Sequence, residues 1–127
     1  MSKRGHYILT RSAENDLHEA RLWSLRRWGK MLTQEYFSDL HRAAEYVAGN
    51  HQALKSRDDL TSDTGLSVYP VREHYLIYLP VAENQIVIVA VMRQSRDIPQ
   101  ILGKASFMIQ REVADILNRI DQGEILL

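Results

Sequence analysis

Apolar and polar positions alternate most regularly between Leu66 and Met92, where three strand-like runs follow one another. In the middle run, Tyr75 and Ile77 point to the face opposite Leu76, as the two-residue period of a strand requires. The last run is apolar on both faces, which is typical of a central strand covered on both sides. We therefore predict three consecutive antiparallel strands, at about Leu66–Pro70, His74–Pro80 and Gln85–Met92.

Two helices are predicted upstream of these strands. A short strand-like run, His6–Thr10, comes first, and Ser12 then offers an N-cap for a helix that ends at Gly29. A second apolar stripe recurs at helical spacing from about Lys30 to Ala48, and Gly49-Asn50 follows as its stop. A glycine corner between two helices predicts an antiparallel αα-hairpin.

A third helix is predicted from about Ala105 to Ile120, bracketed by Gly103 and Gly123. Its apolar side chains share one face, so we expect them to pack on the sheet or on the hairpin. Between the second helix and the first strand of the meander, residues Asn50–Gly65 are polar and lack periodicity, which indicates a surface loop.

This order of elements predicts an α+β fold of the form β-α-α-β-β-β. An N-terminal strand precedes an αα-hairpin packed on a small antiparallel sheet, and a C-terminal helix follows. At 127 residues the chain is expected to form one domain, 1–127, in which residues 104–127 are a C-terminal helical extension.

Composition narrows the possible functions. There are no cysteines, which excludes a disulfide framework and agrees with a cytoplasmic location. Neither a signal peptide nor an apolar run of membrane-spanning length is present, so we expect no membrane association. Sixteen basic residues balance sixteen acidic ones, whereas nucleic-acid binders usually carry a basic excess, so strong direct nucleic-acid binding is not expected.

No cofactor or metal site is predicted. The five histidines are scattered, and none forms the i, i+4 pair that zinc ligands on a helix favour. The six glycines do not form a phosphate-binding loop, and no G-x-S-x-G turn for serine hydrolysis is present.

Three segments together resemble the ParE/RelE toxin superfamily, and more closely its ParE-like branch. They are the helix opening Leu9-Thr10-Arg11-Ser12-Ala13-Glu14-Asn15-Asp16-Leu17 with the corner Arg27-Trp28-Gly29, the run Tyr69-Pro70-Val71 leading through His74 into Leu76-Ile77-Tyr78, and the strand end Val91-Met92-Arg93-Gln94-Ser95-Arg96-Asp97-Ile98-Pro99. The resemblance covers roughly residues 7–102. Many relatives have His where Arg93 stands and Gly where Arg72 stands, and the C-terminal helix extends past the usual end of the family.

The resemblance implies the toxin of a type II toxin–antitoxin system, neutralised by a cognate antitoxin. The ParE branch poisons bacterial DNA gyrase by protein binding, whereas the RelE branch cleaves messenger RNA in the ribosome. Gyrase inhibition is the preferred interpretation. A messenger-RNA endoribonuclease, or a non-toxic family member that acts only as a binding partner, remains an alternative.

The ribonuclease alternative depends on three residues, and no confident catalytic residue is assigned otherwise. Lys55 and Arg72 could supply cations near a scissile phosphate, and His74 could act as base or acid. Relatives that cut RNA tend to carry His or Tyr just after the last core strand, whereas this chain has Arg93 there. Arginine stays protonated and is a poor general base.

Two groups of residues are candidates for protein contacts. The hypothesis for the target is that Arg93 and Arg96 bind it together with Ile109 and Val113 of the C-terminal helix. Alternatively, Arg93 is an ordinary solvated charge, and Asp97 pairs with Arg96 and caps a turn. In that case the apolar stripe of the C-terminal helix belongs to the core. The hypothesis for the antitoxin is that it contacts the aromatic residues Trp23, Trp28 and Tyr36, because aromatic side chains dominate interface hot spots. Alternatively, both tryptophans serve packing. Since they are five residues apart, we do not expect them to share one helical face.

Overall fold

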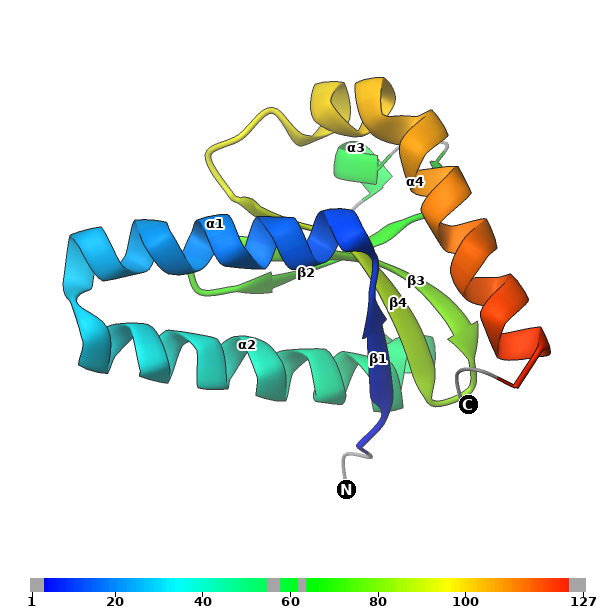
Figure 1. The fold of residues 1–127 in the computed structure, drawn as a ribbon, viewed down its shortest axis with the longest axis horizontal. Coiled ribbons are helices and arrows are strands. Elements are labelled where there is room, and N and C mark those ends of the chain that lie inside the picture. Colours follow the sequence, from blue (N-terminus) through cyan, green and yellow to red (C-terminus); the bar gives the residue numbers. More distant parts are fainter. Residues whose placement is uncertain (1–3, 55–57, 62–63, 124–127) are drawn as a thin grey trace.

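The computed structural model describes residues 4–54, 58–61 and 64–123. Figure 1 shows a helical hairpin, a twisted sheet and a long C-terminal helix. The elements are β1 (His6–Leu9), α1 (Arg11–Trp28), α2 (Lys30–Asn50), a 3-10 helix η1 (His51–Ala53), α3 (Asp58–Thr61), β2 (Ser67–Val71), β3 (His74–Ala82), β4 (Gln85–Arg93) and α4 (Ile98–Asp121).

The sheet has the strand order β1-β4-β3-β2. The antiparallel meander of β2, β3 and β4 is confirmed. β1 adds a parallel pair with β4, from His6 opposite Gln85 to Leu9 opposite Ile88, so the sheet is mixed. The chain from β1 to β4 passes through the helical hairpin, β2 and β3, and this provides the long crossover connection that parallel strands need.

Helix α1 begins earlier than the sequence indicated. Thr10, not Ser12, is its N-cap, and the Thr10 hydroxyl oxygen accepts a hydrogen bond from the Ala13 N–H at 3.0 Å. The Thr10 hydroxyl also donates to the Val89 carbonyl at 3.3 Å, which fixes the start of the helix on β4. The assignment of Ser12 was wrong. Thr10 and Ser12 are both suitable caps by residue type, and only the contact of Thr10 with β4 distinguishes them.

Gly29 forms the corner between α1 and α2, as expected. Its φ of 83° is a left-handed conformation that favours glycine, and its N–H donates to the Leu25 carbonyl at 3.1 Å. At the other end, α2 continues through Gly49 and ends at Asn50, the second residue of the predicted stop. The chain entering β1 packs closely there, since a Cβ on Gly5 would lie 2.4–2.5 Å from backbone atoms of Ala48 and Gly49.

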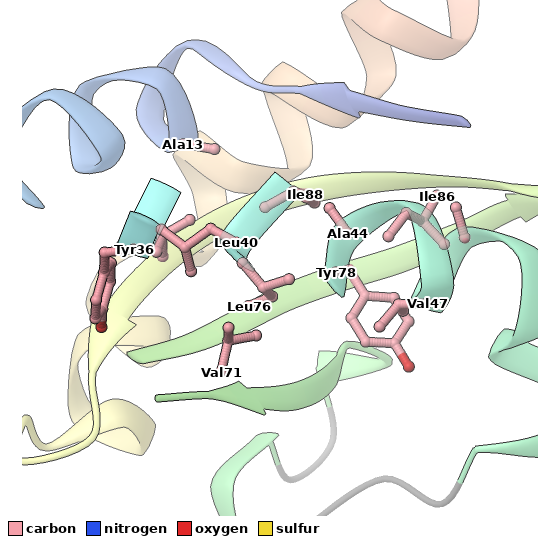
Figure 2. Close-up of a cluster of buried hydrophobic side chains, with 12 residues drawn as sticks. Ala13, Tyr36, Leu40, Ala44, Val47, Val71, Leu76, Tyr78, Ile86 and Ile88 are labelled. Atoms are coloured by element: carbon pink, nitrogen blue, oxygen red, sulfur yellow. The ribbon is translucent and has the colours of Figure 1, made fainter. Parts of the chain in front are cut away.

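Two apolar clusters cover the two faces of the sheet. On one face, Leu40, Ala44 and Val47 of α2 meet alternate residues of β3 and β4 (Figure 2). On the other face, Ile109, Val113 and Ile116 of α4 pack against the intervening residues of the same strands. The core is therefore a sheet enclosed between the hairpin and α4, and the expected packing of the C-terminal stripe on the sheet is confirmed.

The start of α4 and the preceding loop also differ from expectation. Asp97 caps α4 itself, accepting from the Gln100 N–H at 3.4 Å, and Pro99 lies in the first turn. Gly103 is consequently inside the helix and not before it. The expected surface loop at Asn50–Gly65 contains η1 and α3, and Leu60 of α3 packs beside the α4 cluster. No helix in the described part of the chain is long and apolar enough to span a membrane.

Candidate functional site

Arg93 and Arg96 lie beside a hollow of about 320 Å³ at the end of β4, which we call the sheet-end hollow. Its lining combines cations, carboxylates and rings from α1, β3 and the end of β4. The charged and ring-bearing members are Asp16, Glu19, Trp23, Arg26, His74, Arg93 and Arg96. Two of the predicted target-binding residues are therefore brought together, and Asp16, Glu19 and Arg26 of α1, which were not predicted as site residues, join them.

Asp16 fixes α1 to β4 inside this hollow. Its carboxylate accepts a hydrogen bond from the Val91 N–H at 3.0 Å. Burial raises the pKa of Asp16, while the Val91 hydrogen bond and the nearby Arg96 act in the opposite direction. The carboxylate thus holds the last turns of β4 and faces one of the two arginines.

The residues after β4 are held in the same way. The Gln94 side-chain amide donates to the carbonyls of Arg72 at 2.9 Å and His74 at 3.0 Å. The Gln94 backbone N–H donates to the Glu73 carbonyl at 2.9 Å. These bonds attach the end of β4 to the β2–β3 turn and so fix where Arg93 emerges.

Four rings form an aromatic cluster next to the hollow, namely Trp23, Trp28, Tyr36 and His74. The Trp23 and Trp28 ring centroids are 5.0 Å apart in an edge-to-face arrangement. They meet although their spacing of five residues does not place them on one helical face, because large indole rings at the end of α1 reach across the spacing that separates their Cα atoms. Trp28 also packs on Tyr36 at 5.2 Å and Trp23 on His74 at 5.6 Å.

Guanidinium groups lie over the rings of this cluster. Arg93 lies 5.3 Å from the Trp23 ring centroid and Arg27 lies 5.3 Å from it as well. Arg72 lies 5.5 Å from the centroid of Tyr36. Such contacts position the cations without neutralising their charge, so Arg27 and Arg93 stay available to an acidic partner, whereas Arg72 is paired with Asp39.

Tyr36 and His74 are both interior residues. Tyr36 is only 1% exposed and His74 only 2% exposed, while the two tryptophans are half-buried. The Tyr36 hydroxyl forms a short hydrogen bond with Nδ1 of His74 and also accepts from the Glu73 N–H at 3.2 Å. A direct antitoxin contact therefore fits the tryptophans better than Tyr36, whose hydroxyl is used inside the fold.

His74 is neutral at physiological pH. Burial, followed by the positive charge of Arg93 across the β3–β4 register, lowers its pKa to about 4. Proton transfer to a substrate would require the ring to be reached, and Tyr36 and Trp23 cover it. The structure therefore places the proposed acid or base of the ribonuclease alternative away from solvent.

Of the other two residues of that alternative, Lys55 lies outside the described residues, and only Arg72 can be placed. Arg72 occupies the β2–β3 turn with a φ of 53°, and its Nε donates to Asp39 of α2 at 2.7 Å. This left-handed conformation explains why glycine suits the position in many relatives.

Ile109 and Val113 are separated from the arginines because they are buried between α4 and the second face of the sheet. They are 7% and 8% exposed and belong to the cluster on the second face of the sheet. An apolar cavity of about 600 Å³ adjoins them, between α4, α3 and β3. Their role in target binding stays a prediction, and it would require α4 to move off the sheet.

α4 is also attached to the beginning of α1. The Glu112 carboxylate accepts from the Ser12 hydroxyl at 2.5 Å and from the Ser12 N–H at 3.3 Å. A carboxylate at a helix N-terminus is electrostatically favourable. This contact joins residues far apart in the sequence, and no local sequence pattern predicts it.

The alternative pairing of Asp97 with Arg96 is not formed among the described residues, although Asp97 does cap a helix. Within residues 4–54, 58–61 and 64–123, no three side chains of the metal-ligating types gather at one point.

Comparison with known proteins gives a family match, a relative of similar sequence and a solved structure of similar fold. Residues 7–98 match the family model described as the ParE toxin of the type II toxin–antitoxin system, parDE. The chain is 27% identical over 92 residues to the toxin ParE of Escherichia coli, covering 72% of this chain and 87% of that protein.

The fold is similar to a solved chain described as the chromosomal ParDE TA system from P. aeruginosa. The TM-score is 0.58 at 14% identity, over 71% of this chain and 96% of the other. The family match ends where α4 begins, so the hairpin and the sheet carry the likeness and α4 lies beyond it. The resemblance seen in the sequence is confirmed: the chain belongs to the ParE toxin family of type II toxin–antitoxin systems.

Proposed function

We propose that this protein is a toxin that inhibits bacterial DNA gyrase by protein binding and is neutralised by a cognate antitoxin. The observation that carries the proposal is the match to the ParE toxin family over residues 7–98, which includes the whole sheet-end hollow except Ile101. A gyrase target implies action in the cytoplasm.

The target contacts are assigned to Arg93 and Arg96. Both emerge at a sheet end that Asp16 and Gln94 hold in place, so little conformational freedom of the backbone would be lost on binding. Arginine is enriched in interface hot spots because its planar guanidinium pairs with carboxylates and packs on rings. The exposed rim of the aromatic cluster, at Trp23 and Trp28, is assigned to the antitoxin.

The geometry favours binding over RNA cleavage. The one imidazole in the hollow is buried, neutral and hydrogen-bonded to Tyr36. Arg93 and Arg96 supply charge but no proton acceptor. We also propose that α4 is an addition of this chain to the family domain, because the match ends at its first residue.

The proposal is tested by DNA supercoiling with purified gyrase, with cleaved DNA followed in the same reaction. The wild-type protein is expected to inhibit supercoiling and to trap cleavage complexes. Arg93→Ala/Arg96→Ala is expected to raise the concentration needed for half-inhibition by roughly tenfold or more, since hot-spot arginines each carry about 1–2 kcal/mol.

The matched control is Arg4→Ala/Arg42→Ala, which removes two exposed arginines from another part of the molecule. It is expected to inhibit like the wild type. Equal potency of the two double variants, both verifiably folded, would overturn the arginine assignment. A folded wild-type protein that leaves gyrase untouched but cuts messenger RNA on ribosomes would overturn the gyrase proposal itself.

A further inference from the structure

The corner between α1 and α2 carries a concentration of positive charge. Residues 20–32, which we call the hairpin tip, read ARLWSLRRWGKML, with four basic residues and no acidic one. The whole chain is neutral, so the remaining residues carry a net charge of −4 (0 minus +4). Figure 1 shows that the tip projects beyond the strands of the sheet.

The charges of the tip are not neutralised within the fold. In the described part of the chain the ion pairs join Arg42 and Arg72 to Asp39, and His41 to Glu45, and none reaches the tip. Arg21 and Arg27 lie over aromatic rings, which leaves their charge in place. Arg26 and Lys30 are exposed, and Arg26 also lines the sheet-end hollow.

The same tip exposes large apolar side chains. Met31 is 77% exposed, the highest fraction among the exposed large apolar residues of the described chain. Leu22 and Leu25, three residues apart on α1, and Leu32 on α2 are exposed as well. All four lie within about two helical turns of Gly29. Exposed apolar side chains on both helices of one projecting corner, with basic residues next to them in the sequence, favour an interaction surface here.

The beginning of α2 lacks the features that usually stabilise a helix N-terminus. No side chain caps this helix and its first turn has no acidic residue, so N–H groups at its positive end are left to solvent or to a partner. Lys30 adds a cation to that positive end, where an anion is preferred. A carboxylate from outside would satisfy both the N–H groups and Lys30.

We propose that the hairpin tip is a docking surface for an acidic amphipathic helix of a protein partner. Its carboxylates pair with Arg26 and Lys30 and reach the free N–H groups of α2, and its apolar side chains cover Leu25 and Met31. Exposed aliphatic side chains distinguish this surface from a nucleic-acid site, where aromatic faces stack on bases. The inference does not rest on gyrase as the target, because it is argued from the charges and the exposed side chains of the tip alone.

The tip contains its own reporter, because the two tryptophans of the chain are Trp23 and Trp28. The probe is a tryptophan-free peptide of about 18 residues, or about five helical turns, with leucine along one face and glutamate beside it. A second peptide carries lysine in place of every glutamate. Tryptophan fluorescence is titrated with each peptide at low and at high salt.

The acidic peptide is expected to give saturable binding that weakens with salt, and the basic peptide is expected to give none. Arg26→Glu/Lys30→Glu is expected to weaken binding of the acidic peptide roughly tenfold or more. These two residues are chosen because neither lies over a tryptophan ring, so the reporter is undisturbed. The control Lys104→Glu/Arg119→Glu changes net charge equally at exposed positions of α4 and is expected to bind like the wild type.

Met31→Ser tests the apolar part without changing charge, and it is expected to weaken the acidic peptide while leaving the salt dependence unaltered. Absence of saturable binding, equal binding of the two peptides, or equal loss in both charge variants would overturn the proposal. Tighter binding of a short DNA duplex than of the acidic peptide would also overturn it and would reassign the tip to nucleic acid. Circular dichroism melting verifies that each variant is folded.

Discussion

The two faces of the sheet are covered by helices that pack in different ways. On the hairpin face, small residues such as Ala13, Ala44 and Ala48 let α1 and α2 approach the strands closely. On the other face, α4 lies over the strands with branched side chains and leaves a cavity of about 600 Å³ beside it. The face that the family match includes holds the smaller cavity, of about 170 Å³, and the helix beyond the match adjoins the larger one. We therefore expect α4 to tolerate change better than the hairpin.

The largest expected difference between the faces comes from one pair of matched substitutions. Ile86 of β4 is fully buried on the hairpin face, and Ile109 of α4 is 7% exposed beside the cavity. Ile86→Ala is expected to lower the free energy of unfolding by about 4 kcal/mol, because a closely packed site cannot collapse. Ile109→Ala is expected to cost about 2 kcal/mol, because the cavity exists already and alanine favours a helix.

Urea unfolding of the two variants measures the difference, with circular dichroism as the signal. Equal losses would contradict the comparison, and a larger loss for Ile109→Ala would reverse it. The wild type and both variants share the same solvent and temperature, so the difference between the two substitutions is more reliable than either value.

A second difference follows from His74, which belongs to the hairpin face. Its pKa is about 4 in the folded protein and near 6.5 when exposed, so between these values the unfolded chain binds one more proton. Stability from this residue is therefore complete above pH 6.5 and is lost as the pH falls toward 4. The shift corresponds to at most about 3 kcal/mol.

The measurement is the unfolding free energy between pH 7 and pH 4.5. His74→Phe keeps a ring in the cluster but does not titrate, so its pH dependence is expected to be flatter, although losing the Tyr36 hydrogen bond lowers its stability at pH 7. His18→Asn removes an exposed histidine and is expected to keep the wild-type slope. Equal slopes for the wild type and His74→Phe would show that His74 does not cause the acid sensitivity.

Local patterns were enough to predict the elements of the hairpin and the meander. Alternation at Tyr75–Ile77 and the glycine at position 29 act on their own neighbours, so the sequence contains their signal directly. The family resemblance added the two arginines at the end of β4. Tertiary contacts were needed for the rest, because the parallel β1–β4 pair and the choice of Thr10 as N-cap depend on strands distant in sequence.

The candidate site was predicted only in part, because it also depends on contacts between residues that are distant in the sequence. Arg93 and Trp23 could be named, but their contact across 5.3 Å, and the burial of His74 between Trp23 and Tyr36, arise only when α1 and α2 lie on the sheet. The role of Ile109 in target contact, by comparison, was inferred from an amphipathic stripe, and such a stripe does not show whether the sheet or a partner covers it.

The smallest expected effect concerns the attachment of α4 to α1. Glu112→Gln keeps the shape of the side chain but removes the charge that faces the Ser12 N–H and the positive end of α1. The expected cost is about 0.5–1 kcal/mol, and it falls on α4 and on the first turn of α1, which share the contact. Hydrogen exchange should therefore become faster in these two segments and stay unchanged in the rest of α1 and in α2. Asp115→Asn, an exposed carboxylate on the same helix, provides the control. If it loosened α4 as much as Glu112→Gln, general charge and not the contact with Ser12 would account for the effect. If amides of the hairpin beyond the first turn of α1 also exchanged faster, the two faces would be unfolding together and the comparison between them would fail.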